Sequence, residues 1–340
     1  MKNSPISFIL SLLSSVLFFS CCSVSSNNTF QNPDIPCENY RATMREFVIK
    51  ISQTARKTKP DFIVIPQNGQ NVAWDDDDAE ELIPDTDFIN AINGTGREDT
   101  FYGMNKNYDI SDGTPTPVNL SQEIQELCDI YKEAGISVLS IDYTKSNQSK
   151  ITNSYEKNAE KGYISFAATE RALNVIPDYE PYNKNTNNIK SLNEAKNFLY
   201  LINPNKYSSK EEFIQALENT DYDCIIIDLF FAEQMLNSSD LQRLKTKKSG
   251  ASRLVICYMS IGEAEDYRWY WEKSLNSIPP AFLCKENPEW KGNFKVKYWY
   301  PSWQNVIYGQ DGYLTKIVNA GFDGVYLDII DAFEYFEERN

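Results

Sequence analysis

Apolar segments that do not alternate with polar residues recur along the chain, and two of them have nearly the same form. Residues 132–143 (KEAGISVLSIDY) and 318–331 (VNAGFDGVYLDIID) each turn at a glycine and then continue through an apolar stretch to an acid, Asp142 or Asp328. A glycine just after a helix allows a short turn into a strand, and unbroken apolar runs are typical of parallel strands buried on both faces. The pattern predicts an α/β fold with acids at the carboxyl ends of its strands, where enzymes of this class hold their catalytic groups.

Helical and strand-like segments follow one another over most of the chain. Residues 41–58 have apolar side chains at helical spacing, which predicts an amphipathic helix. Residues 178–191 (DYEPYNKNTNNIKS) are rich in Asn, Tyr and Pro, which predicts a linker. Eight strands would close a (β/α)8 barrel, and we take residues 163–168 as an extra strand. The nine strand candidates are residues 61–69, 91–102, 136–142, 163–168, 197–204, 223–230, 253–260, 294–300 and 323–330.

The first residues predict export and anchoring. Residues 1–20 contain one positive side chain and then an apolar stretch, as a signal peptide does. They end at Ser20, and the pair Ser20-Cys21 resembles the lipobox of bacterial lipoproteins. We therefore expect a lipid on Cys21, a flexible tether over residues 21–37, and a protein anchored in the cell envelope, at the outer membrane or the cell surface. The alternative is ordinary cleavage followed by free secretion.

Composition narrows the chemistry that the chain can perform. It has 340 residues, a formal net charge of -15 and no histidine. The absence of histidine excludes Ser-His-Asp and Cys-His catalysis and every histidine metal site, so proton transfer must come from carboxylates, tyrosine, lysine or water. The acidic balance argues against a nucleic-acid partner, and no phosphate-binding glycine motif follows a strand. We expect neither a cofactor nor a metal ion.

Several long motifs lie along the chain, at residues 45–69, 96–103, 260–271, 287–299 and 321–335. Together these motifs resemble glycoside hydrolase family 114. That family contains endo-α-1,4-polygalactosaminidases built on a (β/α)8 TIM barrel, so the resemblance implies one barrel domain over residues 38–340 and a polysaccharide or oligosaccharide substrate. It implies contact with a membrane only through the lipid anchor.

The order of these motifs differs from the order in the family. In the family, the DGVYLDIID strand precedes the strands that contain IPQNG, GRED and SIDY, whereas here those three come first. The resemblance therefore implies a circularly permuted barrel, in which residues 178–191 join the family's usual termini. Permutation is tolerated when the original termini lie close enough for a linker to connect them.

The matching motifs imply a catalytic pair, Asp328 in DGVYLD and Glu98 in GRED. Most glycosidases use two carboxyl groups that flank the bond they cleave. The alternative for Asp328 is a capping or salt-bridged acid. For Glu98 the alternative arises from the adjacent Asp99, since one of the two side chains must point away from the site.

Other acids and amides at strand ends are candidates for holding the substrate. Asp228, Glu263 and Asp142 would hold amines or hydroxyls of the sugar and adjust the pKa values of the catalytic pair. Gln67 and Asn68 end another strand and could bond sugar hydroxyls.

Among the aromatic residues, we expect Trp299 to stack on a sugar ring, because it closes a strand candidate. We expect Trp269 and Trp271 to lie in the core, because they share a short helical segment.

The leading hypothesis is a lipid-anchored, endo-acting glycoside hydrolase that cleaves an α-linked, galactosamine-containing polysaccharide with two carboxylates. An acidic site would attract a de-N-acetylated, cationic chain. The alternative is a non-catalytic, carbohydrate-binding surface lipoprotein that keeps the barrel. Two carboxyl groups facing one site favour catalysis, whereas aromatic residues alone favour binding.

Overall fold

The structure is a computed structural model that describes residues 35–272, 275 and 277–339. The expected signal peptide (residues 1–20), Cys21 and most of the tether lie outside these residues. Within the described part of the chain, no helix combines the length and apolar character needed to cross a membrane.

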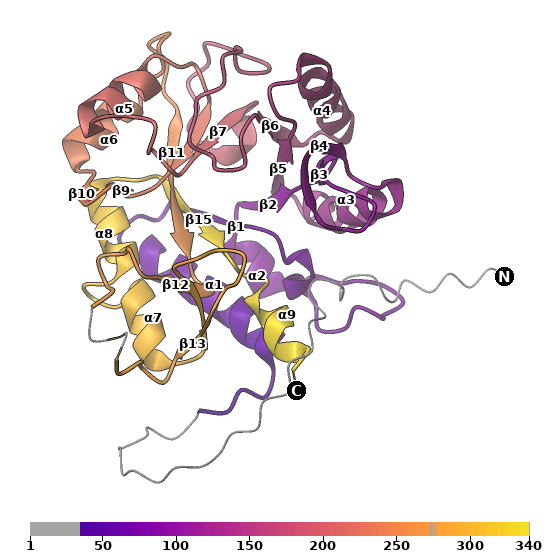
Figure 1. The fold of residues 1–340 in the computed structure, drawn as a ribbon, viewed down its shortest axis with the longest axis vertical. Helices are drawn as coiled ribbons and strands as arrows, with labels where there is room; N and C mark the ends of the chain where they lie inside the picture. Colours follow the sequence, from indigo (N-terminus) through magenta and orange to yellow (C-terminus); the bar gives the residue numbers. More distant parts are fainter. Residues whose placement is uncertain (1–34, 273–274, 276, 340) are drawn as a thin grey trace, which may run out of the picture.

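The fold is mixed α/β with parallel sheets, as the sequence predicts (Figure 1). In the described residues, one sheet has five parallel strands in the order β1-β15-β11-β8-β7, and a second has three in the order β2-β5-β6. The strands are β1 (Ile63–Pro66), β2 (Gly94–Glu98), β5 (Ser137–Tyr143), β6 (Ile164–Ala168), β7 (Phe198–Leu201), β8 (Cys224–Ile227), β11 (Leu254–Ser260) and β15 (Gly324–Asp328).

The two sheets meet at both pairs of edges. At one pair, Gln67 after β1 forms a parallel bridge with Gly96 of β2, and the Asn68 N–H donates to the Gly96 carbonyl at 2.9 Å. At the other pair, the rings of Phe166 in β6 and Phe198 in β7 lie 5.9 Å apart. Each strand therefore has its neighbours in chain order, and the last strand pairs with the first.

The sequence analysis chose the wrong segment as the extra strand. Residues 163–168 contain β6, which pairs with β5 along its whole length. Residues 294–300 instead contribute to β14 (Asn293–Val296), which pairs antiparallel with β12 (Glu263–Glu265) and β13 (Leu283–Glu286). The alternation of Phe294, Lys295 and Val296 is typical of a half-exposed antiparallel strand rather than a buried parallel one.

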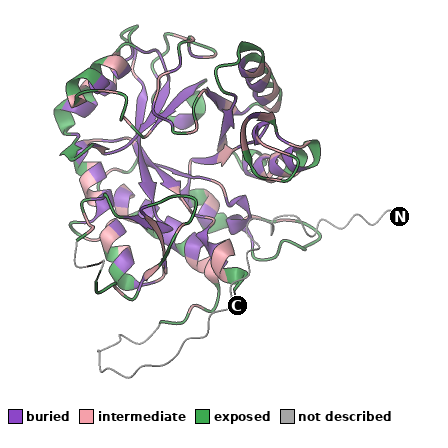
Figure 2. Cartoon of the chain, viewed as in Figure 1, coloured by how far each residue is buried: buried purple, intermediate pink, exposed green. Residues whose placement is uncertain are grey.

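Helices cover the outer faces of the sheets. In Figure 2 the strands are buried, whereas many outward helix faces are exposed. The helices are α1 (Tyr40–Arg56), α2 (Thr86–Ala91), α3 (Val118–Glu133), α4 (Gln148–Lys161), α5 (Lys210–Glu218), α6 (Ser238–Leu244), α7 (Pro301–Tyr308), α8 (Tyr313–Ala320) and α9 (Ala332–Glu337), with 3-10 helices η1 (Gln70–Ala73) and η2 (Leu192–Glu194). Short antiparallel pairs are β3 (Tyr102–Met104) with β4 (Ile110–Pro115), and β9 (Phe230–Phe231) with β10 (Gln234–Met235).

The first helix forms as its periodicity predicts. Asn39 caps it by accepting a hydrogen bond from the Ala42 N–H at 2.8 Å, which satisfies one of the free donors of the first turn. Its apolar face is buried against the sheets and the neighbouring helices, and this face consists of Met44, Phe47, Val48, Ile51 and Ala55.

Two connections differ from the regular alternation of strand and helix. The chain between β6 and β7 has no α-helix and contains only η2 and the expected linker, residues 178–191, most of whose residues are exposed or half-buried. Between β15 and β1, by contrast, there are helices from both ends of the chain. They contact one another, since Arg41 of α1 pairs with Glu337 of α9 at 3.2 Å.

Candidate active site

The carboxyl ends of three neighbouring strands, β2, β1 and β15, hold two acidic side chains between them. Glu98 ends β2 and Asp328 ends β15, and both strands flank β1. Both side chains are half-buried, so each keeps access to solvent. The topology thus brings together two acids that are 230 residues apart in the sequence (328 − 98).

Glu98 is held by three hydrogen-bond donors. Its Oε2 accepts from Gln67 Nε2 at 2.6 Å and from Asn68 Nδ2 at 3.0 Å, and its Oε1 accepts from the Tyr143 hydroxyl. Asn68 also accepts from the Glu98 N–H at 3.2 Å. The three donors act on both oxygens and so fix the orientation of the Glu98 carboxyl group.

Gln67 positions Glu98 and is buried away from solvent. Gln67 is 2% exposed, and its Oε1 accepts from the Tyr200 hydroxyl at 2.9 Å while its Nε2 is bonded to Glu98. The expectation that Gln67 contacts substrate is therefore corrected to a positioning role. Asn68 also bonds the side chain and the backbone of Glu98, but it is half-buried, so its contact with a sugar stays a prediction.

Asp328 has a different environment from Glu98. Its Oδ2 accepts from the Tyr258 hydroxyl at 2.7 Å, and its Oδ1 accepts from the Ile329 N–H at 2.9 Å. Burial raises the pKa of Asp328 to about 8, and the nearby Glu98 charge raises it further against these hydrogen bonds. Asp328 therefore holds a proton at neutral pH, beside a carboxyl group that is surrounded by donors.

The backbone turns sharply just after each of the three strands. Asn68, Asp99 and Ile329 follow β1, β2 and β15, and have φ angles of 59°, 58° and 60°. This left-handed conformation is unusual for a β-branched residue such as Ile329 and costs about 1–3 kcal/mol where it occurs in non-glycine residues. Such strained turns persist where packing fixes them, and they cluster at functional sites.

Tyrosines from four strands line the space between the acids. Tyr143, Tyr200 and Tyr258 donate to Glu98, Gln67 and Asp328 respectively. The fourth, Tyr326, lies with its ring 5.1 Å from that of Tyr200, and its buried hydroxyl has no partner among the described residues.

A buried hydroxyl without a partner is rare in folded proteins. The Tyr326 hydroxyl therefore suits a buried water molecule at this position. Gly96 leaves room for the Tyr326 hydroxyl, because a Cβ on residue 96 would lie 1.9 Å from the hydroxyl oxygen.

A second group of acids lies beside the pair. Asp331 precedes α9 but makes no capping bond; burial raises its pKa to about 6, against the opposing effect of Lys295. Burial and Asp331 raise the pKa of Glu334 to about 8. Glu263 is buried and accepts from Asn287 at 2.9 Å and from Lys295 at 3.2 Å, while its Oε2 has no partner among the described residues. This group was not apparent as a unit from the sequence, because it depends on the turn after β15.

Asp142 is a structural residue rather than a substrate ligand. It is fully buried and accepts from the backbone N–H groups of Phe101 at 2.7 Å and Tyr102 at 3.1 Å. Its other oxygen accepts from Ser154 at 2.6 Å and Asn158 at 3.0 Å. Because its two oxygens accept four hydrogen bonds, Asp142 fixes the loop that follows β2 and has no free position for a sugar.

Asp228 also departs from the expectation. One oxygen accepts from Arg268 at 2.5 Å and the other from the Phe230 N–H at 2.7 Å, in surroundings that exclude most water. The carboxylate is therefore committed to a buried ion pair. It can influence the site through Arg268 but does not reach a substrate directly.

Trp299 lies in an aromatic cluster and does not end one of the parallel strands. Its ring is 4.9 Å from Phe336 and 5.1 Å from Tyr40, and its Nε1 donates to the Ile35 carbonyl at 2.8 Å. It connects α1, α9 and the turn after β14. Packing on several sides makes it a poor platform for a sugar, contrary to the expectation.

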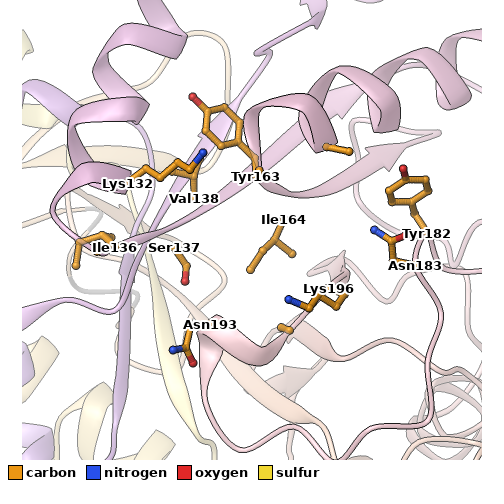
Figure 3. A pocket seen from close by; sticks show the side chains of 14 residues that line it. Lys132, Ile136, Ser137, Val138, Tyr163, Ile164, Tyr182, Asn183, Asn193 and Lys196 are labelled. Carbon is orange, nitrogen blue, oxygen red and sulfur yellow. The ribbon is translucent and has the colours of Figure 1, made fainter.

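A cavity of about 400 Å³ lies at the other end of the strands (Figure 3). It is lined by residues at the amino ends of β5 and β6 and by the linker, including Ser137, Ile164, Asn183 and Lys196. No carboxylate lines this cavity. We therefore assign the chemistry to the acids at the carboxyl ends, where parallel strands place their catalytic groups.

Comparison with known proteins relates part of the chain to a family. Residues 193–340 match glycoside-hydrolase family GH114. The match confirms the family resemblance for this part of the chain, which contains Asp328, Glu263 and Asp228, while Glu98 and Gln67 lie outside it. It begins directly after the linker that precedes β7.

Three curated proteins are similar over part of their length. An uncharacterized protein of Methanocaldococcus jannaschii is 41% identical over 160 residues, which cover 44% of this chain and 45% of the relative. One from Deinococcus radiodurans is 34% identical over 126 residues (37% and 39%), and one from Thermotoga maritima is 45% identical over 84 residues (25% of each). The chain thus spans less than half the length of each of these relatives.

Proposed function

We propose that the protein is a glycoside hydrolase that uses Asp328 and Glu98 as its two catalytic carboxyl groups. The observation that carries this proposal is the pair itself: two acids at the ends of strands beside β1, one held protonated by burial and one surrounded by three donors. The match of residues 193–340 to a glycoside-hydrolase family supports the same reaction class.

The two environments give the two acids different catalytic roles. Asp328, with its raised pKa, gives its proton to the oxygen of the leaving sugar as the bond to the anomeric carbon breaks. Glu98, oriented by Gln67, Asn68 and Tyr143, supports the positive charge that develops on the ring. It acts on the anomeric carbon either directly or through a water molecule that it deprotonates.

The substrate we propose is an α-linked polysaccharide that contains galactosamine and is cleaved within the chain. The second acidic group supports a cationic sugar, because Glu263, Asp331 and Glu334 surround one side of the pair. A free amine on the sugar would lower the electrostatic cost of crowding these carboxyl groups. The net charge of -15 favours the same class of partner.

We further propose that the eight parallel strands form one circularly permuted (β/α)8 barrel. The strands neighbour one another in chain order and β15 pairs with β1. The family match starts at residue 193, near the end of the connection between β6 and β7, which is the connection between parallel strands that lacks an α-helix in the described residues. In the family's order the barrel would therefore begin at β7 and end at β6.

Anchoring at the cell envelope through a lipid on Cys21 is proposed from the sequence alone. Replacing Cys21 by Ala should abolish labelling with a fatty-acid analogue and release the protein from membranes. Labelling that persists in this variant would assign the lipid to another residue.

The decisive experiment is to measure new reducing ends released from partly de-N-acetylated α-1,4-galactosamine polymers and from other bacterial exopolysaccharides. Glu98→Gln and Asp328→Asn should each reduce the rate at least about a hundredfold, the usual effect of losing a positioned acid or base. Asp129→Asn is a matched control, since Asp129 also accepts a tyrosine hydroxyl, from Tyr163, but lies outside the site.

Two outcomes would contradict the proposal. If the wild type cleaves a glycan and both variants keep near-normal rates, the assignment of the pair is wrong. If the wild type binds a glycan and cleaves none, the protein is instead a carbohydrate-binding surface lipoprotein.

A further inference from the structure

Two aromatic side chains are exposed in the segment that follows β12. Tyr267 is 64% exposed and Trp269 is 42% exposed. The sequence analysis placed Trp269 in the core together with Trp271, but only Trp271 is largely packed, with its ring 4.9 Å from that of Phe294. Exposed aromatic residues are common singly, so the surroundings decide whether these two have a function.

A buried charge network holds the segment in place. Arg268, between the two aromatic residues, donates to Asp228 and to Glu265 at 2.5 Å each, and to the Tyr313 hydroxyl at 3.0 Å. All three of the charged residues are less than one-tenth exposed. Burying ionised groups is energetically costly unless they are well paired, so this network gives the segment a fixed conformation.

Each exposed ring is oriented by its own contacts. The Tyr267 hydroxyl donates to Glu265. Trp269 meets Tyr270 and Tyr313 edge-on, with ring centroids 5.7 Å and 6.4 Å away. The rings are therefore held in place while much of their apolar surface faces water, and such pre-organised aromatic surface favours binding because little side-chain entropy remains to be lost.

The segment adjoins the proposed catalytic pair. The guanidinium carbon of Arg268 lies 6.0 Å from the ring centroid of Tyr258, whose hydroxyl donates to Asp328 at 2.7 Å. In Figure 1, β12 lies beyond the carboxyl end of β11. That end of β11 is beside Asp328, because Ser260 pairs with Asp328 in the sheet. The segment therefore lies close to Asp328.

The charges near the rings differ from those at the second acidic group. The Lys316 ammonium lies 4.4 Å from the centroid of Trp269, and Arg268 lies 5.1 Å from that of Tyr267. A cationic sugar would be repelled here, whereas the apolar C–H face of a neutral ring can stack on aromatic surface. The two sides of the catalytic pair thus suit sugars of different charge.

We propose that Tyr267 and Trp269 form a stacking platform for an uncharged hexopyranose unit of the polymer, such as an N-acetylated one, outside the bond that is cleaved. This inference rests on the proposed function, because it assumes that a glycan occupies the acidic site. It adds a specificity rule: the preferred chain has a neutral unit at the platform and a cationic unit at the acids.

The test measures binding separately from cleavage. The double variant Glu98→Gln/Asp328→Asn is run in native gels that contain partly de-N-acetylated α-1,4-galactosamine polymer, and its mobility gives the dissociation constant. Adding Trp269→Ala or Tyr267→Ala should weaken binding about tenfold, which corresponds to about 1.4 kcal/mol. Trp269→Tyr and Tyr267→Phe keep a ring and should restore most of the affinity, while Trp290→Ala, which removes another exposed tryptophan, should change nothing.

Fully de-N-acetylated polymer provides the charge test. With it, the Trp269→Ala effect should shrink to less than about twofold. An equal effect on both polymers would overturn the neutral-unit assignment, and unchanged binding in both alanine variants would overturn the platform.

Cleavage by the wild type separates this inference from the proposed function. If the wild type cleaves the polymer while the alanine variants bind normally, the platform fails and the hydrolase remains. If the wild type does not cleave but the double variant binds through Trp269, the platform remains and the hydrolase fails. If no polymer is bound or cleaved, both fail.

Discussion

Two aspartates that end strands in nearly the same sequence setting have opposite roles, and their donors explain why. Asp142 is fully buried and accepts four hydrogen bonds, whereas the half-buried Asp328 accepts two and lies beside Glu98. The first carboxyl group is fixed by its neighbours and holds a loop in place. The second retains a proton and an accessible edge, which are the requirements of a general acid.

The pH dependence of the reaction follows from the state of Asp328. Burial, with the nearby Glu98 charge, raises the pKa of this acid to about 8, so the folded protein keeps the proton below that pH and loses it above. If the proton is transferred in the rate-determining step, kcat/KM should fall as pH rises through about 8. A pH–rate profile on a soluble polymer measures this directly.

The control for this profile is the stability of the fold, followed by circular dichroism at each pH. The fold should stay intact at the pH values where the rate falls. A rate that stays constant to well above pH 8 would show that Asp328 does not supply the proton.

Tyr143 should contribute to catalysis through Glu98. Removing its hydroxyl in Tyr143→Phe leaves Glu98 with the two amide donors and less firmly oriented. Hydrogen bonds to charged groups contribute about 1.5–3 kcal/mol, so kcat/KM should fall about tenfold or more. The measurement is steady-state cleavage of the polymer by both proteins.

Tyr163→Phe is the matched control for this change, because Tyr163 also donates to a carboxylate, Asp129, far from the site. It should leave kcat/KM unchanged. Equal losses in the two variants would assign the effect to general stability rather than to Glu98.

At the scale of elements, most of the parallel strands were predictable because they are short apolar runs. The end of β15, and with it Asp328, follows from this pattern. The strand β2 (GTGRE) has no apolar side chain, so Glu98 was expected from the family motif GRED instead. The extra strand was misassigned because residues 163–168 are short and contain two alanines, while residues 294–300 are longer and more aromatic. The alternation in residues 294–297 was the signal for a separate antiparallel sheet.

The tyrosines of the site could have been found from the sequence but were not. Tyr143, Tyr200, Tyr258 and Tyr326 lie in or at the end of buried strands, where a phenol needs a polar partner for its hydroxyl. Four such residues in four strands indicate a shared polar interior. Which hydroxyl bonds which acid depends on strand register and tilt, which single-strand patterns do not contain.

Helices α5 and α6 end against a single buried side chain, Arg253. Its guanidinium donates to backbone carbonyl groups at or just beyond both helix ends, including Leu217 at 2.9 Å and Leu244 at 2.6 Å. Arg253→Met would leave these buried carbonyls without partners, and we expect the free energy of unfolding to fall by about 3 kcal/mol. Urea unfolding followed by fluorescence measures the change.

Arg243→Met is the control for Arg253. Arg243 lies on α6 and pairs with Glu211 and Glu218, but its side chain is 34% exposed. Exposed ion pairs contribute at most about 1 kcal/mol, so this variant should lose less than a third as much. A smaller loss for Arg253→Met than for Arg243→Met would mean that the carbonyl groups find other partners.

At the scale of the whole molecule, the two ends of the chain meet in one helical layer. The Tyr40 ring of α1 lies 5.5 Å from that of Phe336 in α9, and Arg41 lies over the ring of Phe333 at 5.1 Å. These helices occupy the connection between β15 and β1. The chain connection between β6 and β7 has no α-helix in the described residues, and the cavity of about 400 Å³ opens beside this connection.

This arrangement predicts that the chain can be reconnected in the family's order. A rearranged protein would start at residue 186, run to residue 339, continue through a short Gly/Ser linker to residue 38 and end at residue 185. Because the joined helices already touch and the new ends lie in an exposed linker, the eight strands keep all their neighbours. We expect the same circular dichroism spectrum and cleavage rate, with a melting temperature within a few degrees of the original.

A control opened inside β8, between Ile225 and Ile226, should not fold, because it breaks a fully buried strand. If the first rearrangement also fails to fold, residues 178–191 are part of the core structure and not a join between former ends.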